Sequence, residues 1–317
     1  MVDKNKNTAL HLAVKYEHLE MVKLLIAADA DDNVLVKMGD KDKNTALHLA
    51  VKIYNHDIVE CLTQIANSGN KLVRMVNKDK DTALHLAVQD SLADVVQLLT
   101  SADHEYEYAP NNAGVTPLYM AVEKGSCDIV EQILEACPSS AYGGPNGDTA
   151  LQRNLVHGNS DIRKLLLEKQ PNQCKVIGEH GRTSLHYAAS IGDTNAVKDI
   201  INSCPSCSKL LDNDGRNFLH LAALNKHVDI VKHALQSNKI SKTVLNKKDD
   251  DGHTPFHIAA KIGNRNLVLP LLQDKRVSKK TENAKGEKAI DAVSVCVRVC
   301  IYIYIYITTM PRNTLKY

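Results

Sequence analysis

Six histidines recur at one position of a repeated pattern, which raises the question of metal binding or acid–base chemistry. They are His11, His48, His85, His186, His220 and His257. Each belongs to a different repeated segment, so they form a ladder along the chain, whereas a metal ion needs three or four ligands that converge on one point. We therefore expect each imidazole to form hydrogen bonds near a helix start and the adjoining turn. The sequence predicts no catalytic residue, no metal and no cofactor.

Cys204 and Cys207 form a C-x-x-C pair, which can mark a redox couple or half of a zinc site. The chain has no second C-x-x-C pair. The two cysteines follow a predicted helix at a turn, and Pro205 is expected to end that helix, with the thiols partly packed. A redox function of this pair is kept as an alternative. The glycine-rich stretch at 143–147 lacks the G-K-[ST] of a phosphate loop and is predicted to be a turn.

The histidines belong to a pattern that repeats along most of the chain. NTALHLAVK occurs at residues 7–15 and again, unchanged, at 44–52. Aligned on its first capping residue, the pattern starts at Thr8, Thr45, Thr82, Thr116, Thr149, Thr183, Asn217 and Thr254, with a degenerate ninth copy at Lys288. Successive copies are 33 to 37 residues apart. A unit of this length cannot bury its own apolar face, so the units are predicted to stack.

Each copy predicts two helices and a turn. The Thr is expected to cap the first helix, because its hydroxyl can accept a hydrogen bond from an unpaired backbone N–H. Pro117 and Pro255 follow the cap, where a missing N–H has no consequence. Segments such as 128–136 and 228–235 carry apolar residues at i, i+1, i+4 and i+5 and predict a second helix. A Gly two residues before the aligned position predicts a turn with positive φ.

The composition is typical of a folded chain in which positive and negative charges nearly balance. Of the 317 residues, 44% are hydrophobic and 24% are charged, and 39 basic against 37 acidic residues leave a net charge of +2. This balance gives no electrostatic argument for nucleic acid, and the early lysines alternate with aspartates, which predicts a solvated mixed face. The N-terminus lacks the apolar segment of a secretory signal, so the eight cysteines are expected to be free thiols in a reducing compartment.

The repeated pattern resembles the ankyrin repeat. GRTSLHYA at 181–188 and GHTPFHIA at 252–259 match the family signature G-x-T-P-L-H-x-A closely. The resemblance implies an all-α ankyrin-repeat solenoid of helix-turn-helix units with β-hairpin-like turns, with eight repeats and a partial ninth. Residues 116–134, 203–223 and 283–292 further resemble plant ankyrin proteins of the accelerated-cell-death type, whose C-terminal membrane domain carries a PGG motif.

Two departures from the family pattern concern stability. Lys6, Lys43 and Lys80 occupy the turn position where the family usually has Gly. A non-Gly residue forced into that turn is expected to cost on the order of 1 kcal/mol. Repeat five reads TALQRN, with Gln152 in place of His, and with Arg153 and Asn154 where small or apolar residues belong. We expect repeat five to be the weakest of the stack.

Residues 1–292 are predicted to form the repeat array, and residues 293–317 form a low-complexity apolar tail. The apolar run at 293–307 is broken by Arg298 and is shorter than the roughly 20 residues that a spanning helix needs. Its alternating Ile-Tyr run can be encoded by a dinucleotide repeat, so we interpret the tail as non-native or disordered sequence. On this interpretation the chain is cytoplasmic and contains no membrane span. The full-length family is expected at the cytosolic side of the plasma membrane.

The resemblance implies protein–protein recognition without enzymatic activity. In the family, turn tips and the exposed end of the first helix form the binding surface. The positions that carry over are Glu179, His180, Arg182, Ser190 and Ile191 in repeat six, Asn213, Asp214, Arg216, Leu224 and Asn225 in repeat seven, and Asp250, Asp251, His253, Lys261 and Ile262 in repeat eight. The expected partner is another protein, not nucleic acid, and the expected role is a scaffold in plant defence or stress signalling. The alternative is a truncated soluble form of a membrane-anchored signalling protein.

Overall fold

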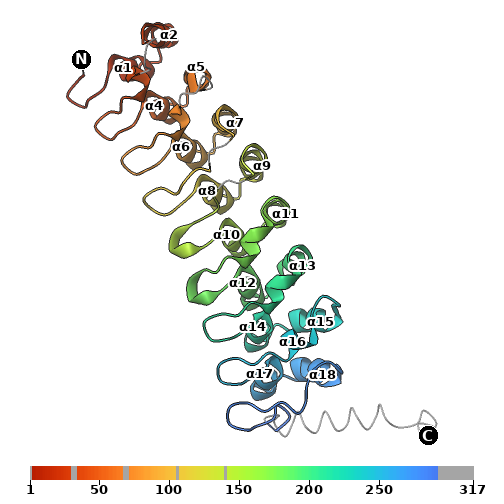
Figure 1. The fold of residues 1–317 in the computed structure, drawn as a ribbon. Coiled ribbons are helices and arrows are strands. Elements are labelled where there is room, and N and C mark those ends of the chain that lie inside the picture. Colours follow the sequence, from red (N-terminus) through yellow and green to blue (C-terminus); the bar gives the residue numbers. More distant parts are fainter. Residues whose placement is uncertain (1, 30–33, 67–70, 105–106, 139–140, 292–317) are drawn as a thin grey trace, which may run out of the picture. The chain divides into compact units, whose positions relative to one another are not determined.

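The computed structural model describes residues 2–29, 34–66, 71–104, 107–138 and 141–291. The chain divides into two compact units, of which the first spans Met1–Gln173 and the second begins at Cys174. Both units are built from pairs of short antiparallel helices (Figure 1).

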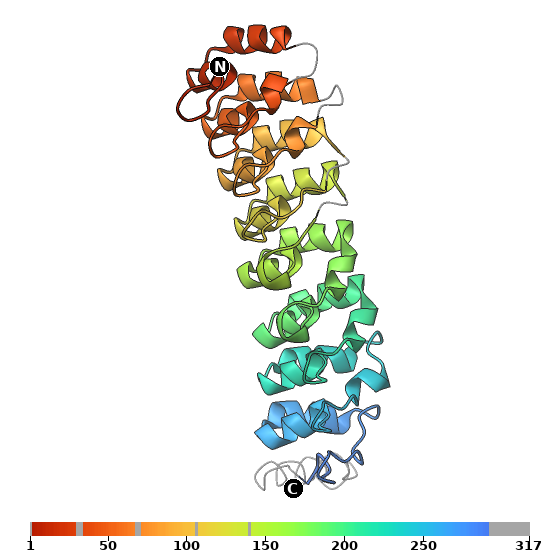
Figure 2. The ribbon, with the colours of Figure 1, turned by 60° about the vertical axis from the view of Figure 1, so that its left-hand side comes forward.

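The described residues of unit 1 form five helix pairs. They are α1 (Ala9–Lys15) with α2 (Leu19–Ala28), α4 (Ala46–Lys52) with α5 (His56–Ala66), α6 (Ala83–Gln89) with α7 (Ala93–Ala102), α8 (Pro117–Glu123) with α9 (Cys127–Ala136), and α10 (Ala150–His157) with α11 (Ser160–Lys169). First helices pack on first helices of neighbouring pairs, and second helices pack on second helices (Figures 1 and 2). Short elements between the pairs are α3 (Val34–Lys37), η1 (Leu72–Arg74), η2 (Pro145–Gly147) and η3 (Pro171–Lys175). The predicted glycine-rich turn at 143–147 is confirmed by η2.

Unit 2 forms three helix pairs of the same kind within residues 174–291. They are α12 (Ser184–Ile191) with α13 (Thr194–Ser203), α14 (Phe218–Leu224) with α15 (Val228–Gln236), and α17 (Pro255–Ile262) with α18 (Arg265–Gln273). Shorter elements are η4 (Glu179–Gly181), η5 (Pro205–Lys209) and α16 (Lys242–Leu245). The ninth copy contributes a turn, closed by an antiparallel bridge between Glu282 and Lys288. The predicted hairpin-like turns therefore form, and the described ranges contain isolated β-bridges but no β-strand.

The first helices form because a cap starts them and small apolar residues fill their inner face. Thr8 and Thr82 accept a hydrogen bond from the backbone N–H three residues later, which confirms the predicted caps. Pro117 and Pro255 occupy the first helical position, as predicted. The core consists mainly of Leu, Ile, Val and Ala side chains that are fully buried. A helix of about two turns has little stability alone, so this burial against neighbours holds it.

A hydrogen bond from each repeated histidine joins one repeat to the following turn. Nε2 lies 2.8–3.1 Å from a backbone carbonyl oxygen in the pairs His11–Asn44, His48–Asp81, His85–Val115, His186–Arg216, His220–His253 and His257–Glu287. A carbonyl oxygen only accepts, so Nε2 carries the proton, and Nδ1 is an acceptor in the repeats whose cap is Thr. In repeat two, the Thr45 backbone N–H and hydroxyl donate to Nδ1 of His48. The predicted hydrogen bonding near the helix start is confirmed, and the bond to the next repeat adds to it.

These imidazoles are buried, and burial disfavours their charged form. It lowers the pKa of His48 and of His220 from 6.5 to about 4. It also lowers the pKa of His85, His186 and His257. These five histidines therefore act as neutral structural links at neutral pH.

An Asp or Asn side chain closes most of the turns. In repeat seven, Oδ1 of Asp212 accepts from the backbone N–H groups of Asp214 and Arg216, at 3.0 and 2.9 Å. In repeat eight, Oδ1 of Asp249 accepts from the N–H of His253 at 2.7 Å. Gly215 lies inside the repeat-seven turn at φ 72°, which confirms the predicted left-handed glycine position. The turns are therefore fixed structures and not loose loops.

Lys6, Lys43 and Lys80 each adopt φ of 60° at the glycine position. The prediction that these lysines are held in a left-handed turn is confirmed. Their side chains are exposed. The long charged groups therefore reach solvent, although the backbone conformation is unfavourable.

Repeat five keeps its cap but contains a buried amide without a partner. The Thr149 N–H donates to Oε1 of Gln152 at 2.7 Å, so Gln replaces His as the capping partner. Asn154 is fully buried, and neither of its side-chain polar atoms has a hydrogen-bond partner among the residues described. The corresponding position holds Ala50 and Ala222 in other repeats. The structure thus places the source of the expected weakness at Asn154, while that weakness itself stays a prediction.

The described helices include none that is both long and apolar enough to cross a bilayer. The predicted tail at 293–317 lies outside the described residues.

We expect stability to fall with acidification because of the histidine links. The folded pKa of His48 is depressed, so its contribution is present above pH 6.5 and is lost as pH falls from about 6.5 towards about 4. His48→Gln, which introduces the residue of repeat five, should reduce this pH dependence by on the order of 1–3 kcal/mol. Urea unfolding at pH 7.5 and 4.5 measures it. An equal acid sensitivity in wild type and variant would contradict the assignment.

Asn154→Ala is expected to raise the free energy of unfolding by about 1–3 kcal/mol, because it removes a buried unpaired amide. Thermal and urea unfolding of the whole chain check this. A variant less stable than wild type would show that Asn154 has a favourable interaction.

Comparing Gly252→Ala with Gly286→Ala separates the cost of a strained φ from the cost of a steric clash with neighbouring atoms. Both glycines have φ of 76°. A Cβ on Gly252 would lie 2.6 Å from the Ala284 nitrogen, whereas a Cβ on Gly286 meets nothing within 4 Å. Gly286→Ala should cost about 1 kcal/mol, and Gly252→Ala distinctly more. Equal losses in urea unfolding would mean that the turn at 252 relaxes.

Candidate partner-binding groove

The fifteen residues predicted to bind a partner all lie in unit 2, and none of them is buried. They fall into two rows. The tip row lies on the turns before α12, α14 and α17, and the helix-end row lies at the C-terminal ends of these helices (Figure 1). We call the surface that carries both rows the groove face. The structure thus brings the predicted positions together on successive repeats, while their role in binding stays a prediction.

Backbone hydrogen bonds hold the three turn tips side by side. The Asn213 N–H donates to the His180 carbonyl, and the Asp250 N–H donates to the Asp214 carbonyl, both at 3.1 Å. The side chains of these four residues and of Glu179 and Asp251 are exposed. The tip row is therefore an ordered edge with its side chains available to solvent.

Behind the tips, each Arg faces the Asp that closes the next turn. Nε of Arg182 is 3.9 Å from Oδ2 of Asp212, and Nε of Arg216 is 4.0 Å from Oδ2 of Asp249. Arg216 also donates to Asp214 at 2.7 Å. Asp249 is nearly buried, and its Oδ1 lies 3.7 Å from Nδ1 of His253. These contacts balance the charge of the arginines and fix their position.

The helix-end row carries exposed aliphatic side chains. Ile191 and Leu224 are the last residues of α12 and α14, and their relative exposures are 53% and 44%. Ile262 ends α17 and is partly exposed. Ser190 and Asn225 bond locally to the carbonyls of Tyr187 and Leu221. Large apolar groups at one register of three repeats make this row suited to apolar contact.

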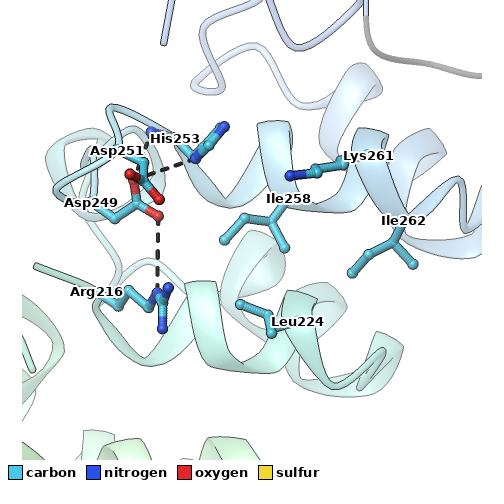
Figure 3. Close-up of a pocket in the computed structure, with 8 residues that line it drawn as sticks. All are labelled: Arg216, Leu224, Asp249, Asp251, His253, Ile258, Lys261 and Ile262. Carbon is cyan, nitrogen blue, oxygen red and sulfur yellow. Dashed lines mark hydrogen bonds and ion pairs between the residues drawn. The ribbon is translucent and has the colours of Figure 1, made fainter. Parts of the chain in front are cut away.

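A cavity of about 320 Å³ lies between the two rows in repeats seven and eight. Six predicted residues line it: Arg216, Leu224, Asp251, His253, Lys261 and Ile262. Asp249 and Ile258 complete the lining and were missed from the sequence. In Figure 3 the carboxylates of Asp249 and Asp251 gather with His253 on the turn side, opposite the aliphatic side chains of the helices. The cavity is thus polar at one side and apolar at the other.

The six repeated histidines lie one to a repeat and do not converge on one point. The described residues contain no group of three or more His, Cys, Asp or Glu side chains that could hold a metal ion. Each of the six imidazoles already bonds to a cap and to a carbonyl of the next turn, so its two nitrogens are occupied.

Cys204 and Cys207 are buried free thiols at the end of α13. Pro205 begins η5 directly after the helix, which confirms the predicted helix stop with packed thiols. Burial raises the pKa of Cys204, and a hydrogen bond with Cys174, together with burial, raises the pKa of Cys207. A protonated buried thiol is a poor nucleophile, so this geometry disfavours the redox alternative.

Comparisons with known proteins agree with this architecture. A family model described as "Ankyrin repeats (3 copies)" matches residues 1–71, 34–108, 53–142 and 185–283. The ANK repeat-containing protein nipk-1 of Caenorhabditis elegans is 36% identical over 76 residues, which are 23% of this chain and 12% of that protein. The crystal structure of the ankyrin repeat domain of Bcl-3, titled a unique member of the IkappaB protein family, has a TM-score of 0.61 and 24% identity, over 73% of this chain and 99% of that chain. Since the family model matches more than half of the residues and the helix pairs carry the same fold, the chain belongs to the ankyrin repeat family.

Proposed function

We propose that this chain is a non-enzymatic scaffold that binds a protein partner through the groove face of repeats six to eight. Ankyrin repeats form protein–protein interaction domains. The observation that carries the proposal is the cavity of about 320 Å³, which adjoins two ordered rows of exposed side chains. Binding sites combine such a concave apolar surface with a few placed polar groups.

The apolar part of the groove face supplies the main affinity. Leu224 is a large side chain that is half-exposed at the cavity wall, so a partner that covers it removes apolar surface from water. Binding energy is usually concentrated in a few such central residues. The tip row, which stays at the edge, sets orientation and selects partners by charge.

Leu224→Glu tests this proposal, with Val156→Glu as a matched control. Both residues lie seven positions after the aligned residue of their repeat, and Val156 is 71% exposed in repeat five of unit 1. We expect Leu224→Glu to weaken partner binding at least about tenfold, because it places a charge in the apolar contact, and Val156→Glu to bind normally. Chemical crosslinking in tissue extract with quantitative mass spectrometry, followed by calorimetry on the captured protein, measures the effect.

Equal capture by wild type and both variants would contradict binding through the groove face. Loss of capture in both variants, with circular dichroism unchanged, would move the site away from repeats six to eight.

We further infer a role in defence or stress signalling. The support is the resemblance of residues 116–134 and 203–223 to plant ankyrin proteins of the accelerated-cell-death type. In one form of this proposal the array is the cytosolic arm of a membrane-anchored signalling protein. Lines lacking the gene should respond abnormally to pathogen challenge or to salt. A normal response to both would argue against this role, and fractionation of the native protein would decide between the anchored and the free form.

A further inference from the structure

The charge around the apolar cavity indicates the chemical class of the partner. We propose that the groove face of unit 2 receives a basic amphipathic protein segment, with an aliphatic side chain in the cavity and Lys or Arg residues against Asp250 and Asp251. This inference rests on the proposed function, because it names the partner chemistry of the same face.

The apolar side of the cavity is made by two neighbouring first helices. Leu224 comes from α14, and Ile258 and Ile262 come from α17 (Figure 3). The volume of about 320 Å³ is at the small end of the range for binding pockets, and it suits one or two large side chains better than a whole ligand. The occupant is therefore an anchor residue of a longer segment.

The positive charge of Arg216 is already balanced within the protein. Its guanidinium donates to Asp214 at 2.7 Å and lies 4.0 Å from Asp249. Asp249 in turn accepts from the His253 N–H. An anionic partner group would have to displace these contacts, so Arg216 does not make the cavity an anion site.

Asp250 and Asp251 carry negative charge that is not used in an ion pair among the described residues. Both side chains are exposed, and neither forms an ion pair with any residue in the described part of the chain. Their backbone is fixed, because the Asp250 N–H donates to Asp214 and the Asp251 carbonyl accepts from Ala284. A cationic side chain would gain from these carboxylates without first breaking an internal pair.

Lys261 fixes the orientation of the segment. It extends from α17 towards the turn side of the cavity (Figure 3) and has no ion pair within the described ranges. A basic residue close to Lys261 would be repelled, so the basic residues must lie along the tip row, with the apolar residues along the helix-end row.

The tip row of unit 2 is more acidic than the turns of repeats one to three. Residues 178–182, 212–216 and 249–253 contain six acidic residues and two arginines. The corresponding turns of repeats one to three, at 3–7, 40–44 and 77–81, contain five acidic residues and six lysines. Lys41 and Lys78 stand where unit 2 has Asn213 and Asp250. An acidic protein, nucleic acid or anionic lipid would be repelled by the tips of unit 2, whereas a basic protein segment is attracted.

Two defined peptides test the inference on the full chain. One is an amphipathic helix about three heptads long, with Leu at one heptad position and Lys or Arg beside it, and the other has Glu in place of each basic residue. A heptad rises about 10.5 Å, which is close to the 8–10 Å between packed helices, so its Leu residues can reach successive repeats. Fluorescence anisotropy should give at least about tenfold tighter binding of the basic peptide, with an affinity that falls as salt rises.

The double variant Asp250→Asn and Asp251→Asn should weaken the basic peptide about three- to tenfold. The matched control, Asp42→Asn and Asp79→Asn, removes two carboxylates from tips in unit 1 and should leave the affinity unchanged. Leu224→Glu should abolish the preference for an apolar anchor and weaken binding of both peptides.

Equal affinity for both peptides, no binding of either, or equal effects of the two double variants would overturn the basic-segment inference. A native partner that is captured through Leu224 but is acidic at its contact would also overturn it, while the proposed function would stand. If no captured protein loses binding when Leu224 is replaced by Glu, the proposed function itself is overturned.

Discussion

The bond from a buried imidazole to the next turn is the interaction on which the rest of the array depends. A neutral histidine has one donor and one acceptor, and here both are used: Nδ1 of His48 accepts from Thr45, and Nε2 donates to the Asp81 carbonyl 3.0 Å away. One side chain therefore fixes the start of a helix and the position of the following turn at the same time. Because the ring is buried, water cannot replace either bond.

Fixing the turns frees their tips to vary. In most repeats the backbone of the tip is held by an Asx side chain from within and by a hydrogen bond to the tip before it, as at Asp212 and Asn213. Side chains at the tips then contribute little to stability. The same scaffold can carry Lys78 and Lys80 in one repeat and Asp250 and Asp251 in another. Partner choice is thus separated from folding, which is why the fold alone does not name the partner.

The repeat period made most of the fold predictable. Caps, first-turn prolines and left-handed glycines follow from local chemistry, and the structure confirms them at Thr8, Pro255 and Gly215. The cavity was only partly predictable. Ile258 was missed because its place in the helix is that of a core residue. Its side chain is only 8% exposed. Asp249 was missed because the sequence shows it as one of three consecutive aspartates, and only the fold separates their roles.

The different roles of these aspartates determine which carboxylates can attract a partner. Asp212 and Asp249 are nearly buried, close their own turns and face an arginine of the preceding repeat, so their charge is used by the fold. Asp250 and Asp251 follow in sequence but point to solvent without an ion pair in the described ranges. A count of carboxylates would treat all four alike. Only the last two can lower the energy of a cationic partner without a loss elsewhere, because their attraction replaces contacts with water and not contacts within the protein.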